Sequence, residues 1–355
     1  MVNYIFPSVE SNLKLERHCP HCHRFGGNRH SSIHNRAISD IRVQTIAQQR
    51  MKCPYCGTTW TNRVQGVGHG RQRSERLITM GVFLYMLGLS YRAVETFLLA
   101  FEWKGSKSSI ERDVAQAGQK AKALHMQAPA MQVRILGVDG TGAKMAGQKA
   151  GMLFFVDVER KRLLCAEPIN ETDTRRVRRH VRRVIDLLGA EELRTDELSV
   201  YEHIVPEPMH RICIAHWLKS KCRRAWDLSR KFRSEGMLYE AETMLELIRM
   251  LHLHRNNPDI PPEIERLVRR FINCRSGLLW KANQLLQHIE RTWRRVSRDP
   301  IDATNNTTER IIGLTYKIRA KTMRGFKSPQ KALSHPYLAQ FIRGTEGICD
   351  FRKVI

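Results

Sequence analysis

The sequence predicts a multidomain α/β protein, and three observations support this prediction. The chain has 355 residues, enough for roughly two or three domains of about 150 residues each. Apolar residues make up 42% of it and charged residues 27%, as in globular proteins and unlike disordered tails. From Val133 onward, apolar runs of strand length alternate with helical patterns, which predicts a mixed sheet covered by helices.

The net charge of the chain indicates what kind of molecule it binds. Lysine and arginine number 60 against 35 aspartates and glutamates, so the formal charge is +25. Such a charge favours a polyanionic partner and argues against an enzyme for a small acidic substrate. No apolar run approaches the roughly 18 to 20 residues of a membrane span, and the first residues lack a signal-peptide pattern. We expect a cytoplasmic protein without membrane contact, and a secreted disulfide scaffold is excluded.

Two Cys-x-x-Cys pairs near the start predict a zinc site. Cys19-Pro-His-Cys22 and Cys53-Pro-Tyr-Cys56 each place two thiolates on a tight turn, as tetrahedral zinc requires. The 30 residues between the pairs exceed the usual spacing, and a nearby histidine can replace one cysteine. The alternative is a set of reactive or merely buried thiols. Four histidines lie near the first pair: His21, His23, His30 and His34.

Residues 1–66 are therefore predicted to form a zinc ribbon. Residues 58–64 alternate in polarity like a strand and can pair with residues 41–52. Such a ribbon has little core, so the metal supplies much of its folding energy. Its usual role is to position nucleic acid or protein.

Residues 72–117 predict a helix-turn-helix DNA-binding domain built from three short helices. Gly88 ends the first helix, Ser90 caps the second, and a polar break at residues 104–105 precedes the third. The last helix would enter the major groove of double-stranded DNA. An ordinary three-helix packing unit is the alternative. The residues expected to face phosphates or bases are Lys104, Lys107, Ser108, Ser109 and Arg112.

The region from Val133 to residue 216 predicts strands and one basic helix. The first strand is expected to end at Asp139 in a glycine-rich turn, and residues 151–157 and 162–168 read as two further strands. Residues 210–216 read as a later strand. Six arginines in nine residues would repel one another without phosphates nearby, so we expect the basic helix to contact DNA. The arginines assigned to DNA are Arg175, Arg178, Arg179 and Arg182.

Three acids far apart in the sequence are candidates for a magnesium site. Asp139 follows an apolar run, Asp196 opens a turn, and Glu309 lies near the start of a predicted helix. Carboxylate oxygens suit Mg²⁺ or Mn²⁺, and two such ions can act on a phosphodiester. Glu197 competes with Asp196, although strand register favours Asp196. Asp157 also ends an apolar run, and we interpret it as a hairpin residue.

Several of these motifs resemble those of transposases. Asp139 in Gly-Val-Asp-Gly-Thr, Asp196 in Thr-Asp-Glu-Leu-Ser, and Cys213-Ile-Ala-His216 resemble the first two acids and the Cys-x-x-His signature of the Mutator-like transposase group. Residues 304–309, Thr-Asn-Asn-Thr-Thr-Glu, and residues 324–328, Arg-Gly-Phe-Lys-Ser, resemble the third-acid block of bacterial insertion-sequence transposases. The resemblance covers about residues 72–345.

The resemblance implies a ribonuclease H-like catalytic core in two parts, residues 133–216 and 301–345, separated by a helical insertion at 217–300. It implies a DDE triad of Asp139, Asp196 and Glu309 that holds magnesium and joins element ends to target DNA. His216 would lie near the scissile phosphate, although Cys213 and His216 can instead be core residues. Basic residues after the third acid would hold phosphates: Lys317, Arg319, Lys321, Arg324 and Lys327.

The implied biology is that of a bacterial, nucleoid-associated enzyme. Because transposition brings two DNA ends together, we expect a homo-oligomer. Two other functions stay open on the sequence alone. One is a non-catalytic DNA-binding regulator derived from a transposase, and the other is a metal-dependent nuclease that cuts without joining.

Overall fold

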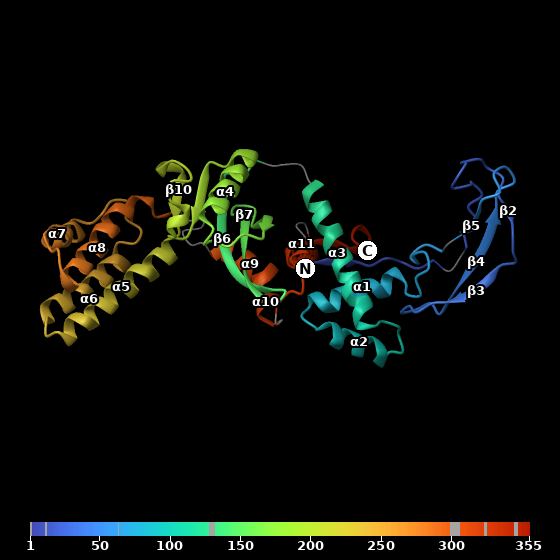
Figure 1. Cartoon of the computed structure of the whole chain (residues 1–355), viewed down its shortest axis with the longest axis horizontal. Helices are drawn as coiled ribbons and strands as arrows, with labels where there is room; N and C mark the ends of the chain where they lie inside the picture. Colours follow the sequence, from blue (N-terminus) through green and yellow to red (C-terminus); the bar gives the residue numbers. More distant parts are fainter. Residues whose placement is uncertain are drawn as a thin grey trace. The chain divides into compact units, whose positions relative to one another are not determined.

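The computed structural model describes residues 2–10, 13–62, 64–127, 132–298, 306–322, 325–343 and 347–355. The chain is a mixed α/β protein that divides into two compact units (Figure 1). The first unit joins Met1–Ala128 to Gln330–Ile355, and the second is Pro129–Pro329. Residues 330–345, which the resemblance assigns to the catalytic core, thus belong to the first unit.

The first unit begins with a small antiparallel sheet around β4 (Thr45–Lys52). β4 pairs with β2 (Asn28–Arg29), β3 (His34–Ala37) and β5 (Thr59–Asn62). The predicted pairing of residues 58–64 with residues 41–52 is confirmed, because Lys52 lies opposite Thr59. The buried core beneath this sheet is very small. Its members are Ile38, Ile46, Val64 and Val67.

Three helices follow at the positions that the sequence predicts. α1 spans Glu75–Met86 and α2 spans Tyr91–Ala100, and the hydroxyl of Ser90 caps α2 by accepting the N–H of Ala93. α3 spans Lys107–Gln127, ten residues beyond the predicted end of the domain at 117. The extension is expected of its sequence, because Lys-, Ala- and Gln-rich segments are good helix formers.

The end of the chain completes the first unit. α11 (Pro329–Arg343) lies against α3, where Lys331 forms an ion pair with Glu111 at 2.5 Å. β11 (Ile348–Asp350) then pairs in parallel with β1 (Asn3–Ile5). This long-range pairing explains why the last residues belong to the first unit.

The second unit is built on a five-stranded mixed sheet in the order β10-β9-β6-β7-β8. β6 (Ile135–Met145), β7 (Gln148–Asp157) and β8 (Arg162–Glu167) form an antiparallel meander. β9 (Glu192–Thr195) and β10 (His210–Ile212) continue the sheet in parallel with β6. Both predicted strands after Asp139 are confirmed.

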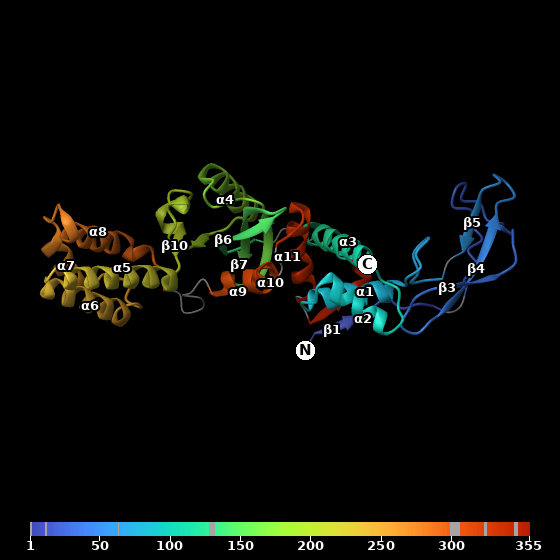
Figure 2. The ribbon, with the colours of Figure 1, turned by 60° about the horizontal axis from the view of Figure 1, so that its bottom comes forward.

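Helices cover both faces of this sheet, as Figure 2 shows. α4 (Thr174–Leu188) packs on the face that carries Val138. α9 (Asn306–Ile312) lies on the other face, where a side chain at Gly137 would collide with Thr308. α9 continues as one helical stretch through a π-helical turn, η4 (Gly313–Lys317), into α10 (Ile318–Thr322).

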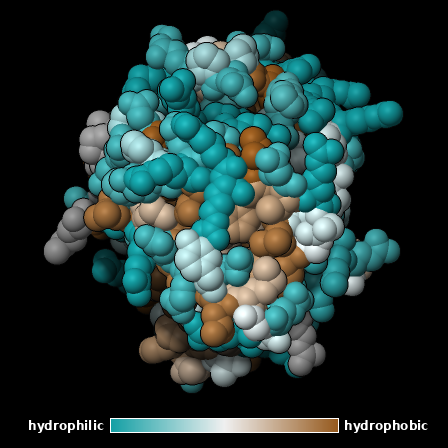
Figure 3. Space-filling view, turned by 90° about the vertical axis from the view of Figure 1, so that its left-hand side faces the viewer, coloured by the Kyte–Doolittle hydropathy of each residue, from teal (hydrophilic) through white to brown (hydrophobic). Residues whose placement is uncertain are grey.

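Four helices of the second unit form a bundle with its own core (Figure 1). They are α5 (Ile214–Ser234), α6 (Leu238–Leu253), α7 (Pro262–Phe271) and α8 (Gly277–Thr292). The bundle leaves the sheet directly after β10 and returns beside it, since Ser297 N–H donates to Ile212 O at 2.8 Å. Figure 3, which faces the bundle end, shows hydrophobic side chains among hydrophilic ones.

The prediction of a strand over residues 210–216 is only partly correct. β10 ends at Ile212, and α5 begins at Ile214, so His216 lies on the first turn of a helix. The apolar run Ile-Cys-Ile-Ala fits the interior of a strand and of a helix equally well, so periodicity could not locate the boundary.

Candidate functional site

Three carboxylates from different parts of the second unit meet beside the central strand. Asp139, Glu171 and Asp196 each offer an oxygen, and these oxygens lie within 4.8 Å of one another. β9 pairs with β6 only as far as Gly137, so the edge of β6 opens just before Asp139. Asp196 directly follows Thr195, the last residue of β9, and therefore reaches the same place.

The expected turn after Asp139 is wrong. β6 continues through Gly-Thr-Gly to Met145, because β7 is long enough to pair with every residue from 136 to 145. Asp139 thus lies within a strand, opposite Phe154, and only 9% of its surface is exposed. Its position at an open edge of the sheet follows from the shortness of β9, which the sequence around Asp139 does not reveal.

Glu171 is the member of this acid cluster that the sequence analysis does not predict. After β8 the chain crosses back over β7 and β6, and glycines stand at both crossing points. A Cβ atom at Gly151 would lie 2.4 Å from Cα of Asn170, and one at Gly140 would lie 2.2 Å from Cδ of Glu171. Glycines inside strands indicate such close approaches, and they were the available signal.

Gly140→Ala is expected to weaken metal binding without unfolding the protein. The added methyl group would displace the Glu171 carboxylate, a flexible side-chain end, from Asp139. We expect about tenfold weaker Mn²⁺ binding by calorimetry, and an unfolding free energy within about 1 kcal/mol of wild type. Gly142→Ala is the matched control, because nothing lies within 4 Å of its Cβ. Equal Mn²⁺ affinities in the two variants would contradict this role for Glu171.

Glu309, the predicted third acid, lies beside this cluster but is not one of its three members. Its carboxylate accepts from Nε2 of His216 at 3.0 Å. Lys317 lies 3.7 Å from Asp139 on the same helical stretch. The predicted neighbourhood of His216 and the acids is thus observed. Asp157 binds the guanidinium of Arg160 in the β7–β8 hairpin, as expected.

The electrostatics of the cluster favour a cation. Burial, together with the charges of Glu171 and Glu309 and opposed in part by the charge of Lys317, raises the pKa of Asp139 to about 6. Burial likewise raises the pKa of Asp196 to about 6, against a hydrogen bond from the Leu198 N–H. Carboxylates that are buried or half-buried, repel one another and offer only oxygen atoms fit a hard divalent ion.

His216 carries the opposite electrostatic bias. Interaction with Cys213, together with the charges of Glu309 and Asp196, raises the pKa of His216 to about 9. The imidazole is therefore cationic at neutral pH. Among the described residues, Cys213 and His216 belong to neither of the two groups that can hold a metal.

A cavity of about 810 Å³ adjoins the acids. Glu171 lines it together with the loop that crosses the sheet, and Lys144 and Lys149 supply positive charge. Its remaining walls are mainly apolar and include Met152 and Ile169. A space of this kind, with two lysines and an acid in its lining, can admit part of an organic anion.

The buried His210, which is bonded to Thr195 next to Asp196, is expected to make the stability of the protein depend on pH. Burial, and then the charge of Arg295, lowers the pKa of His210 to about 4. An unfolded histidine has a pKa near about 6.5, so the neutral ring stabilises the fold above that pH. This contribution, about 3 kcal/mol in full, is lost as the pH falls from about 6.5 toward 4.

Urea unfolding at about pH 7 and about pH 4.5 tests this contribution. Wild type is expected to lose more unfolding free energy on acidification than His210→Gln, which has no imidazole at this position. Equal losses in the two proteins would show that His210 is not the group responsible.

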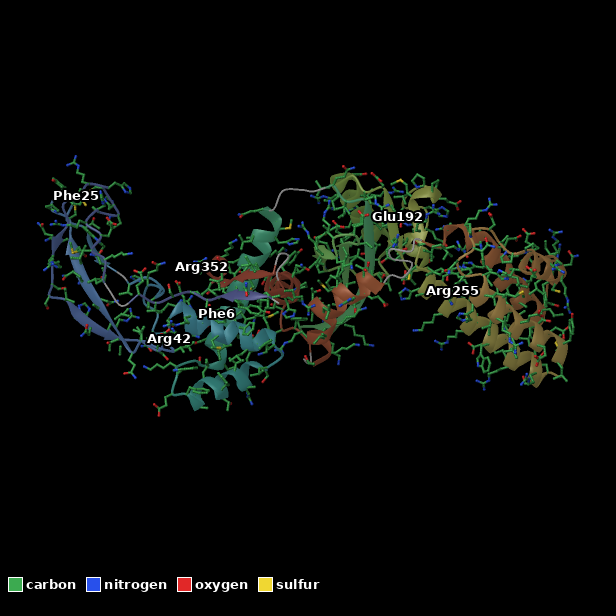
Figure 4. The ribbon with its side chains drawn as sticks, turned by 180° about the vertical axis from the view of Figure 1, so that it is seen from behind. Phe6, Phe25, Arg42, Glu192, Arg255 and Arg352 are labelled. Atoms are coloured by element: carbon green, nitrogen blue, oxygen red, sulfur yellow. The ribbon has the colours of Figure 1, made fainter. Side chains whose placement is uncertain are left out.

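The second group of possible metal ligands is the predicted cysteine cluster. Sγ of Cys19 lies 3.5 Å from that of Cys56, and Cys22 lies 3.6 Å from Cys53. Four sulfurs around one zinc ion at about 2.3 Å would lie about 3.8 Å apart, so the donor set fits. The nearby ring of Phe25 is exposed (Figure 4), and Arg17 lies over it.

The pKa values of these thiols also favour a bound cation. Thr58, through its hydroxyl and N–H, lowers the pKa of Cys56 to about 5. The Arg24 N–H favours the thiolate of Cys22, but burial and the three neighbouring thiols outweigh it and raise its pKa to about 11. Four thiols at this spacing ionise together only when a cation offsets their charge.

Some of the residues predicted to contact DNA are exposed, and two arginines among them donate hydrogen bonds to backbone carbonyls. At the start of α3, Lys104, Ser108 and Arg112 are exposed, and Lys107 and Ser109 are half-buried. On α4, Arg178 donates to Val200 O and Arg182 donates to Ile204 O, so both arginines brace the following loop. Arg175 and Arg179 are exposed on α4, as are Lys321 and Lys327 beyond α9.

Two of the residues predicted to contact phosphates, Arg319 and Arg324, are not seen on the surface of the described structure. Arg319 is only 6% exposed, so its charge lies inside the fold instead of on its surface. Arg324 lies outside the described residues, as do Thr304 and Asn305 of the third-acid motif.

Searches against known proteins gave no identification. No protein-family model matches the chain, and no curated protein matches its sequence. Within the described residues, every helix is too short or too polar to cross a membrane.

Proposed function

We propose that this chain is a DDE-type DNA transposase that cleaves DNA and transfers the freed 3′-hydroxyl end to target DNA. The observation that carries the proposal is the gathering of Asp139, Glu171 and Asp196 within 4.8 Å, with Glu309 and His216 beside them. Acids from four separate segments rarely converge at a half-buried edge without a metal ion to hold.

The architecture supports a ribonuclease H-like core for the second unit. A three-stranded meander followed by two parallel strands, with a helix between β8 and β9, agrees with the fold that the sequence resemblance implies. The interruption of the core by a helical bundle before α9 also agrees with it. In the first unit, the cysteine cluster beside β4 and β5 supports a zinc ribbon.

The metal centre would use oxygen ligands from Asp139, Glu171 and Asp196, with Glu309 available beside them. Bound Mg²⁺ or Mn²⁺ would activate a water or 3′-hydroxyl and stabilise the leaving oxygen of the phosphodiester. Cationic His216 can donate a hydrogen bond to a phosphate oxygen, and Glu309 orients its ring. Lys317 neutralises part of the carboxylate charge before DNA binds.

The first unit would recognise double-stranded DNA at the element ends. The exposed lysine, serine and arginine at the start of α3 suit contact with phosphates and base edges. The overall charge of +25 makes this binding strong and sensitive to salt. A homo-oligomer would hold two DNA ends at once.

A joining assay tests the proposal. The full chain is incubated with Mg²⁺, plasmid target, and labelled duplexes made from the DNA that flanks its own reading frame. Labelled ends joined to plasmid are the expected product. Cuts without joining would replace the transposase by the nuclease, and binding without cuts would replace it by the DNA-binding regulator.

A further inference from the structure

The two residues that flank Asp196 are each held by groups outside its loop. Glu197 is bonded to the helical bundle, and Thr195 is bonded to His210 of β10, which is bonded in turn to Arg295 in the segment that leaves the bundle. The carboxylate of Asp196 accepts a hydrogen bond from the Leu198 N–H within the same loop, at Oδ1 and 3.1 Å. Its position therefore depends strongly on its two neighbours.

Glu197 joins two helices of the bundle. Its Oε1 accepts from Nζ of Lys221 on α5 at 2.5 Å and from Nε2 of His288 on α8 at 2.6 Å. The side chain of Lys221 is only 1% exposed. Arg291 donates to Nδ1 of His288 at 3.2 Å, which leaves the ring proton on Nε2 to donate to Glu197. The carboxylate is thus held by both helices and does not belong to the acid cluster.

The other flank is fixed by a chain of three hydrogen bonds. Arg295 donates to Nδ1 of His210 at 2.8 Å, and Nε2 of His210 donates to the hydroxyl of Thr195 at 2.9 Å. That hydroxyl donates to the backbone carbonyl of Asp196 at 2.7 Å. Thr195 is therefore held by His210, which precedes the bundle, and through it by Arg295, which follows the bundle.

We propose that Lys221 and His288 are positioning residues for Asp196, acting through Glu197, so that the helical bundle is a working part of the metal centre. The inference rests on the proposed function only in taking Asp196 as a metal ligand. A buried lysine–glutamate pair stabilises a fold little better than an apolar pair of similar size. We infer that the pair instead fixes the orientation of the segment that carries Asp196, because hydrogen bonds to the residues around a metal ligand orient that ligand.

Mn²⁺ titration of the full chain by calorimetry, without DNA, separates positioning from simple electrostatics. Lys221→Met removes a positive charge near the site, so a purely electrostatic role predicts tighter Mn²⁺ binding. Positioning predicts about tenfold weaker binding. The matched control is Arg233→Met, which breaks an exposed ion pair of α5 with Glu242 and is expected to leave the affinity unchanged.

Two further variants separate positioning from fold stability. The charge-neutral double variant Lys221→Met with Glu197→Leu is expected to melt near wild type but still bind Mn²⁺ about tenfold more weakly. Full recovery of affinity in that variant would overturn the proposal. If it does not fold, His288→Leu and His288→Gln give the answer. Only the glutamine keeps a donor, and positioning predicts that only the glutamine variant retains affinity.

The outcomes also distinguish this inference from the proposed function. If wild type does not bind Mn²⁺, or if Asp139→Asn does not weaken binding, the metal centre itself is wrong. If both behave as expected and Lys221→Met binds Mn²⁺ as well as wild type or better, only the positioning role fails.

Discussion

Asp139→Asn is expected to abolish DNA cleavage and strand transfer, by at least about 10³-fold, while leaving the protein folded. The substitution keeps the shape of the side chain and removes the charge that a divalent ion requires. Metal-assisted stabilisation of a phosphodiester transition state contributes several kcal/mol, and about 4 kcal/mol corresponds to a 10³-fold change in rate. Binding of DNA at salt-matched conditions is expected to stay within about twofold, since this binding depends on the basic surface.

The same variant is expected to be more stable than wild type in metal-free buffer. The pKa of Asp139 is about 6 in the folded chain, above its ordinary value of 3.8. A raised carboxyl pKa means that ionisation costs stability as the pH rises through about 6. At neutral pH the asparagine therefore relieves up to about 3 kcal/mol.

Thermal unfolding with and without Mg²⁺ checks both statements. Magnesium is expected to raise the melting temperature of wild type and to leave that of Asp139→Asn almost unchanged. Glu159→Gln is the matched control, because Glu159 pairs with Arg134 in an exposed ion pair. An Asp139→Asn variant that still joins DNA, or is stabilised by Mg²⁺ as wild type is, would remove Asp139 from the metal centre.

Two members of the acid cluster, Asp139 and Asp196, could be predicted from the sequence. Asp196 directly follows the last residue of β9, Glu192–Thr195, and the turn that the sequence predicts at Asp196 agrees with this position. Asp139 was identified despite an error in its strand, because an acid after an apolar run signals a polar edge in either case. Glu171 could not be found in this way. Its position depends on a loop that crosses two strands, and only the glycines at 140 and 151 carry that information.

The basic residues show a second limit of sequence reasoning. The arginine run of α4 was assigned to phosphates because its charges would repel one another. The structure shows that Arg178 and Arg182 find partners in backbone carbonyls of the following loop, which no local pattern reveals. The choice between Asp196 and Glu197 likewise depends on distant residues. The carboxylate of Glu197 is bound by Lys221 and His288, which come from helices 24 and 91 residues away in the sequence.

Removal of zinc is expected to unfold the sheet around β4 while the second unit stays folded. The apolar cluster packed on that sheet is small, with Ile38, Ile46, Val64 and Val67 as its buried members, and domains with so small a core depend on a metal. Structural zinc contributes roughly 10 to 16 kcal/mol of apparent binding energy in comparable small domains. A chelator, or Cys53→Ser, is therefore expected to reduce zinc to well below one equivalent per chain. Amide exchange should then accelerate in β4 and stay slow in β6 and β7.

The control for this experiment must separate loss of zinc from loss of any thiol. Cys222→Ser removes a partly buried cysteine of α5 that lies outside the cluster, and it is expected to keep full zinc content. Slow exchange in β4 after complete removal of zinc would show that the cysteines are not structural ligands. Faster exchange that spreads to β6 would mean that the two compact units do not unfold independently. Because the exposed Phe25 and its arginine lie beside these cysteines, weaker DNA binding on zinc loss would also connect the ribbon to substrate recognition.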